Sequence, residues 1–99
     1  MTDKIERLSK FISAFELLKN ASTAKEHSDA IEDILSEFNS WTYSQDRGVI
    51  VMASLKALLD NLTYFSLLKI EGNQEDSLSN LSWTISEQMN SLYGFCYPD

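Results

Sequence analysis

Hydrophobic and polar residues recur with helical spacing in four successive stretches of the chain. In residues 3–20 the apolar positions lie three and four residues apart, which is the spacing of one face of an α-helix. They are Ile5, Leu8, Ile12 and Phe15, widened by Phe11, Ala14 and Leu18. Thr2 is of a type that caps the start of a helix. We therefore expect a helix over residues 3–20.

A second helix is expected over residues 23–44. Thr23 is followed three residues later by Glu26, which is the spacing of a capping box. The apolar face then continues with separations of four and three residues through His27, Ile31, Ile34, Phe38 and Trp41. Gly48 is expected to close this segment after a short turn through residues 45–47.

The third and fourth helices are expected over residues 49–71 and 74–93, separated by Gly72 and Asn73. Residues 49–71 are apolar around most of the helix, so this helix is either central or part of a dimer interface. The fourth helix buries Leu78, Leu81, Ile85, Met89 and Leu92. Gly94 and Pro98 are expected to end it and leave a short aromatic tail, residues 94–99.

This pattern predicts an all-α fold, a small four-helix up-down bundle formed by a single helical domain over residues 1–99. Short connections favour antiparallel neighbours. Three glycines and one proline are too few for the many turns of a β-sandwich or barrel.

Charge narrows the class of partner. The net charge is −7, and residues 21–47 carry six carboxylates against two basic side chains. Direct binding to nucleic acid is disfavoured, because it needs clustered Lys and Arg, and a basic protein partner is favoured. The longest uninterrupted apolar run is Val49–Ala53, and no basic segment leads into an apolar one. We expect no membrane segment, no secretory signal and a cytoplasmic location.

The inventory of reactive side chains argues against an enzyme. The chain has one histidine and one cysteine, and it lacks a glycine-rich phosphate loop and a pair of histidines at metal spacing. We expect no cofactor, no metal site and no catalytic residue. His27 is interpreted as a packing or capping residue, and Cys96 as either a small buried hydrophobe or an exposed thiol.

The second predicted helix has an acidic outer face. At about 100° per residue, four carboxylates fall within about 80° of each other, away from the apolar face. They are Glu26, Asp29, Asp33 and Glu37, and no Lys or Arg follows them on that face. Such a ridge is either simply solvated or steers a basic protein surface toward the helix.

Two aromatic residues lie off the apolar faces of their helices. Trp83 projects nearly opposite Ile85 and Met89, and Tyr43 is off the apolar face of the second helix. Trp and Tyr are common in binding hot spots, so both are candidate anchors, together with Phe95 and Tyr97 of the tail. Packing of Trp83 under the tail or against a neighbouring helix is the alternative.

The function expected from these features is that of an acidic protein-binding module that neutralises or regulates a basic protein partner, of the immunity-protein or inhibitor type. The predicted partner-binding residues are Glu26, Asp29, Asp33, Glu37, Tyr43 and Trp83. One alternative is a homodimeric helical chaperone or regulatory subunit that pairs through residues 49–71 and separates when Leu59 or Phe65 becomes polar. A further alternative is a DNA mimic that inhibits a nucleic-acid enzyme.

Overall fold

A computed structural model describes the backbone of residues 2–72 and 75–97 and the side chains of residues 6–72 and 77–97. Within these residues there are four α-helices, one short 3-10 helix and no β-strand. The helices are α1 (Thr2–Asn20), α2 (Ala24–Asn39), α3 (Gly48–Glu71) and α4 (Glu75–Cys96), with η1 (Gln45–Arg47) before α3. The predicted all-α class is confirmed.

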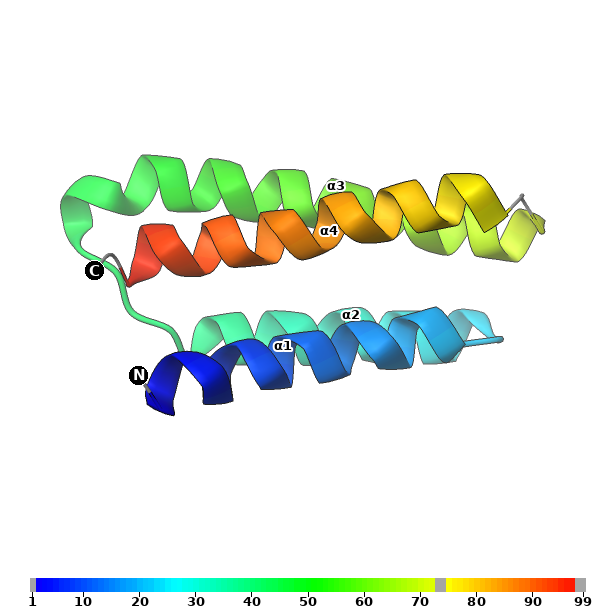
Figure 1. Cartoon of the computed structure of the whole chain (residues 1–99), viewed down its shortest axis with the longest axis horizontal. Coiled ribbons are helices and arrows are strands. Elements are labelled where there is room, and N and C mark those ends of the chain that lie inside the picture. Colours follow the sequence, from blue (N-terminus) through cyan, green and yellow to red (C-terminus); the bar gives the residue numbers. More distant parts are fainter. Residues whose placement is uncertain (1, 73–74, 98–99) are drawn as a thin grey trace. The chain divides into compact units, whose positions relative to one another are not determined.

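The chain divides into two compact units, Met1–Trp41 and Thr42–Asp99. In the first unit α1 packs against α2, and in the second α3 packs against α4. Each pair forms an antiparallel hairpin (Figure 1). The expectation of one domain over residues 1–99 stays a prediction.

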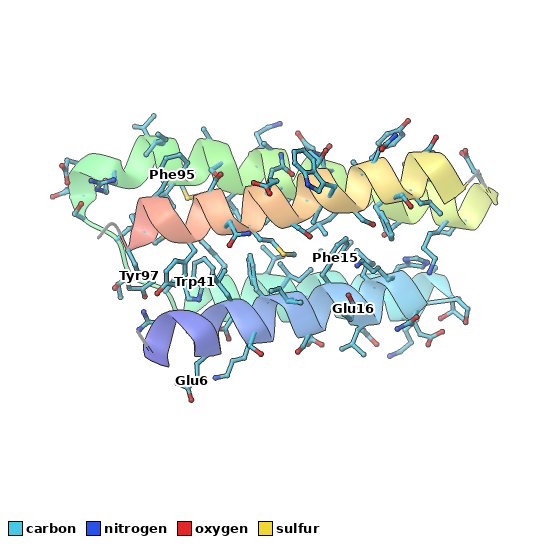
Figure 2. All side chains as sticks on the ribbon, viewed as in Figure 1. Glu6, Phe15, Glu16, Trp41, Phe95 and Tyr97 are labelled. Carbon is cyan, nitrogen blue, oxygen red and sulfur yellow. The ribbon has the colours of Figure 1, made fainter. Side chains whose placement is uncertain are left out.

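Most of the described apolar positions that the spacing predicted are buried in the α1–α2 hairpin, while Leu8 and Ile31 are partly exposed. Phe11, Phe15, Leu18, Ile34 and Phe38 are buried. Phe15 and its neighbour Glu16 leave α1 on different sides (Figure 2). Ile12, however, is 49% exposed, because the buried face of α1 is narrower than the apolar stripe. The predicted roles of the Thr2 and Ile5 side chains lie outside the described residues.

Helix α2 starts as predicted and ends earlier. The Glu26 backbone N–H donates to Thr23 Oγ1 over 3.1 Å, which confirms the cap. The helix ends at Asn39 rather than residue 44, where Ser40 caps it and its Oγ donates to the Glu37 carbonyl oxygen over 2.7 Å. Trp41 therefore lies beyond the helix, and it is still buried, at 5% exposed.

The glycines have different effects. Gly72 ends α3, as predicted, and its φ of 73° is a left-handed conformation that glycine adopts without strain. Gly48 was expected to close the preceding segment and instead begins α3, after the predicted turn through residues 45–47 has formed η1. The expectation that Gly94 ends the last helix was wrong, since α4 continues to Cys96. One glycine costs a helix only about 1 kcal/mol, and Tyr93 and Cys96 on either side of it are buried.

Helix α4 buries most deeply the later residues of its predicted apolar face. Ile85, Met89 and Leu92 are fully buried, while Leu78 and Leu81 are partly exposed. The predicted role of Pro98 in ending the helix and the predicted helix start at residue 74 lie outside the described residues.

Helix α3 is apolar around most of its surface but is buried on one side only. Its buried side holds Val51, Leu55, Leu58, Leu62, Phe65, Ser66 and Leu68. Its other side exposes Val49, Ile50, Met52, Tyr64, Leu67 and Ile70. The segment Gln45–Glu71, which contains this helix, is long and apolar enough to cross a membrane by length and composition, a property shared by core helices of soluble proteins.

Candidate functional site: the acidic groove of the α1–α2 hairpin

Two neighbouring open hollows follow the seam between α1 and α2. The larger, of about 430 Å³, is lined by Ser9, Lys10, Ser13, Ala14, Leu17, Asp33, Ser36 and Glu37. The smaller, of about 170 Å³, is lined by Leu17, Glu26, Asp29, Ala30 and Asp33. Leu17 and Asp33 line both, so the two hollows adjoin and are treated together as one groove. We call it the acidic groove.

All four predicted carboxylates line the acidic groove. They share one side of α2 because Glu26, Asp29, Asp33 and Glu37 are three or four residues apart. The opposite wall comes from α1 and contributes mainly small side chains and Leu17, which is 58% exposed. The groove therefore offers an apolar contact beside negative charge, which suits a partner side chain with an aliphatic stem and a cationic head.

The carboxylates differ in what already binds them. Glu26 Oε1 accepts hydrogen bonds from the Ser22 hydroxyl over 3.0 Å and the Thr23 hydroxyl over 3.1 Å. It also accepts one from the Ser22 backbone N–H over 3.3 Å. The hydrogen bonds from Ser22, followed by those from Thr23, lower the pKa of Glu26. Glu26 thus holds the helix start while it stays ionised.

Asp29 is the groove carboxylate that forms an ion pair. Lys25 Nζ lies 2.9 Å from Asp29 Oδ2, one helical turn away. The hydrogen bond to Asp29 and its negative charge raise the pKa of Lys25. The expectation that no basic side chain offsets the charge of these carboxylates was incomplete. It considered only residues that follow the carboxylates in the chain, and Lys25 precedes them. Lys10 of α1 adds a second positive charge at the groove.

Glu37 lies near the end of α2, where the helix dipole disfavours a negative charge. The indole Nε1–H of Trp41 donates to Glu37 Oε1 over 3.3 Å, and this contact partly offsets the unfavourable position. Asp33, midway along the groove and exposed, makes no hydrogen bond or ion pair with the described residues. Asp33 and Glu37 are therefore the charges that the larger hollow presents to a partner.

The two predicted aromatic anchors belong to the other unit. Tyr43 lies in the segment before η1, where its hydroxyl is 3.9 Å from Met52 Sδ, and it is 39% exposed. Trp83 is 68% exposed on α4, so it is not covered by the tail. The structure brings the four carboxylates together in one groove, while Tyr43 and Trp83 do not line it.

The remaining candidate residues do not line the acidic groove. His27 is buried, at 4% exposed. Burial raises the pKa of the Cys96 thiol, which lies in the last turn of α4. Tyr97 Oη accepts a hydrogen bond from the Thr42 backbone N–H over 2.8 Å, which ties the end of this unit to its beginning. No group of three or more His, Cys, Asp or Glu side chains is placed to hold a metal ion in the described part of the chain.

Sequence reasoning missed the α1 side of the groove. Leu17 was not assigned a role, and Ser9, Lys10 and Ser13 gave no signal by themselves. Their shared feature is that they flank the buried stripe of α1, which a helical projection shows only once α2 is known to be the neighbour.

No protein-family model, curated protein or solved structure matches this chain.

Proposed function

We propose that this protein is an acidic protein-binding module that neutralises or regulates a basic protein partner, and that the partner enters the acidic groove. The observation that carries the proposal is that four carboxylates and the exposed Leu17 line the acidic groove. Against them the groove has one lining lysine, Lys10, and one ion-paired neighbour, Lys25. A cationic side chain therefore meets net negative charge there.

Steering and anchoring are separate parts of this proposal. The charges of Asp33 and Glu37 attract a basic surface at long range and raise the rate of association. Leu17 supplies apolar area, whose burial slows dissociation. Tyr43 and Trp83 remain proposed contacts of the second unit, supported by their exposure.

The first test compares capture of partners by three forms of the protein. The groove variant combines Asp33→Asn with Glu37→Gln. The control combines Glu32→Gln with Glu87→Gln, which removes the same charge at exposed positions that do not line the groove. We expect a basic protein retained by the wild type and the control, and lost by the groove variant.

Kinetics with the captured protein then separate the two parts of the proposal. The groove variant should associate at least about tenfold more slowly at low salt, and the difference should shrink at about 1 M salt, where the Debye length is ~3 Å. Leu17→Ser should instead raise the dissociation rate. If the control slows association as much as the groove variant does, net charge acts without the groove.

A second test needs no natural partner. A synthetic amphipathic peptide with Lys and Leu one helical turn apart is titrated into ¹⁵N-labelled protein, and a peptide with Glu in place of Lys is the control. The proposal predicts shifts at Ser13, Leu17 and Ser36 with the lysine peptide alone. Shifts confined to α3 and α4 would contradict it, and displacement of the captured partner by duplex DNA would favour the DNA-mimic alternative.

A further inference from the structure

The exposed side of α3 has a regular composition. Its residues at positions 49, 53, 56, 60, 63 and 67 are separated by four and three residues in turn, which keeps them on one stripe of the helix. In order, the stripe consists of Val49, Ala53, Lys56, Asp60, Thr63 and Leu67, and all six are exposed. Met52 and Tyr64 flank it and are 51% and 54% exposed. We call the six residues the α3 stripe.

The α3 stripe is complementary to itself when it is read backwards. About the level of Leu58, Val49 is the counterpart of Leu67, and Ala53 is the counterpart of Thr63. Lys56 is the counterpart of Asp60. In an antiparallel pair of helices with heptad spacing, these counterparts occupy the same layers. The two outer layers would each contain two apolar side chains, and the two intermediate layers two small ones. Each central layer would pair a lysine with an aspartate.

We propose that α3 pairs with α3 of a second copy of this chain, antiparallel and centred at the level of Leu58. The central charges select this orientation. Lys56 Nζ lies 3.1 Å from Asp60 Oδ2 within one chain, and both side chains are well exposed. In the antiparallel pair each lysine also faces Asp60 of the second copy, whereas a parallel pair would set Lys56 against Lys56 and Asp60 against Asp60.

Size supports the same arrangement. The stripe from Val49 to Leu67 spans about 27 Å at 1.5 Å per residue, which is enough for the six layers. Ala53 and Thr63 beside the charged centre let the two helices approach closely. Val49 is 87% exposed, and its proposed counterpart Leu67 is 51% exposed. Each copy therefore supplies an exposed apolar group at both ends of the seam.

A lipid bilayer is the other surface that an apolar helix face of this length could contact. The segment Gln45–Glu71 has the length and hydropathy of a membrane-crossing helix. A charged pair at the middle of the exposed face would then lie at the depth where charge is most costly. The same pair is complementary to a second copy, so the structure favours the chain itself as the occupant.

The residues named in the earlier dimer alternative need correction. Phe65 is 3% exposed on the buried side of α3, and Leu59 is partly buried and lies off the α3 stripe. A polar residue at position 65 would destabilise the hairpin itself, so its effect would not report on the pairing of two copies. The variants that test pairing must lie on the α3 stripe.

The test is sedimentation equilibrium of the full chain over a range of concentrations up to about 1 mM, with charge-reversed variants. Lys56→Glu places a carboxylate against Asp60 of the second copy, and Asp60→Lys places an ammonium group against Lys56 of the second copy. Each variant alone should dimerise at least about tenfold more weakly than the wild type. An equimolar mixture of the two should dimerise, because both central layers are then complementary.

The matched control is Lys25→Glu. It breaks the Lys25–Asp29 ion pair of α2, which has the same one-turn spacing as the Lys56–Asp60 pair. The control should dimerise like the wild type, and circular dichroism should show that every variant keeps its helix content. A wild type that stays monomeric at the highest concentration, or dimers that ignore both charge reversals, would overturn the proposal.

Cysteine crosslinking tests the orientation. Val49→Cys and Leu67→Cys proteins are prepared separately and oxidised alone or as a mixture. Cys96 is buried, so the wild type is the blank. The mixture should form the disulfide-linked dimer, and neither variant alone should do so. Efficient Val49→Cys self-crosslinking would indicate a parallel pair and overturn the register.

Cosedimentation with lipid vesicles by a protein that forms no dimer would assign the exposed side of α3 to a membrane instead.

Discussion

The ring of Trp41 packs against the ring of Phe11, with ring centroids 4.7 Å apart and planes inclined by 39°. Phe11 lies in the middle of α1, and Trp41 lies two residues beyond the end of α2. Both side chains are buried. A residue outside the helices thus completes the core of the first hairpin.

Replacement of Trp41 should test this contact. Trp41→Ala removes a large buried side chain and should lower the free energy of unfolding by about 3–5 kcal/mol. Trp83→Ala is the control, because Trp83 is 68% exposed, and it should change stability by less than about 0.5 kcal/mol. Urea unfolding followed by circular dichroism measures both. Equal losses in the two variants would show that Trp41 does not anchor the hairpin.

The two tryptophans should also differ in fluorescence. Trp41 is 5% exposed and Trp83 is 68% exposed. In Trp83→Phe the remaining emission should be blue-shifted and protected from iodide. In Trp41→Phe it should be red-shifted and readily quenched. Similar quenching in both variants would contradict the exposure of Trp83, on which its proposed role as a binding anchor depends.

The cap at the start of α2 should make stability depend on pH. Hydrogen bonds from Ser22 and Thr23 lower the pKa of Glu26 below its ordinary value of 4.5. Because the pKa is lower in the folded state, the charge of Glu26 stabilises the fold above that value, and the stabilisation is lost as pH falls through the folded-state pKa. Wild type and Glu26→Gln should therefore differ at neutral pH and converge in acid.

Chemical unfolding between pH 3 and pH 7, at about 0.1 M salt, measures this convergence. Glu32→Gln, at an exposed position on the same helix, is the control. A Glu26→Gln variant that stays less stable than the wild type by the same amount at every pH would show that the carboxylate charge is not involved.

Ser66 should be replaceable with a gain in stability. It is 8% exposed on the inner side of α3, and its Oγ has no hydrogen-bond partner among the described residues. Ser66→Ala removes this buried hydroxyl and improves helix propensity, so the free energy of unfolding should rise by about 1 kcal/mol. Ser91 is exposed on α4, so Ser91→Ala improves helix propensity alone and should raise the free energy of unfolding by less. A loss of stability in Ser66→Ala would show that the hydroxyl is satisfied.

Local signals in the sequence were sufficient wherever the physical cause was local. The Thr23–Glu26 cap and the end of α3 at Gly72 depend on groups within a few residues, and both were predicted. Failures occurred where distant burial decided the outcome. Gly94 does not end α4, because the burial of Tyr93 and Cys96 outweighs the small helix penalty of glycine.

For the candidate site, the sequence alone determined that Glu26, Asp29, Asp33 and Glu37 share one face, because helical spacing dictates it. It also determined an acidic, all-α chain. Only the tertiary structure decided that Leu17 and Lys10 complete a groove with those carboxylates, because that depends on which faces of α1 and α2 meet. The same reason applies to α3: composition made it apolar nearly all round, and only tertiary packing decided which residues became core and which remained exposed.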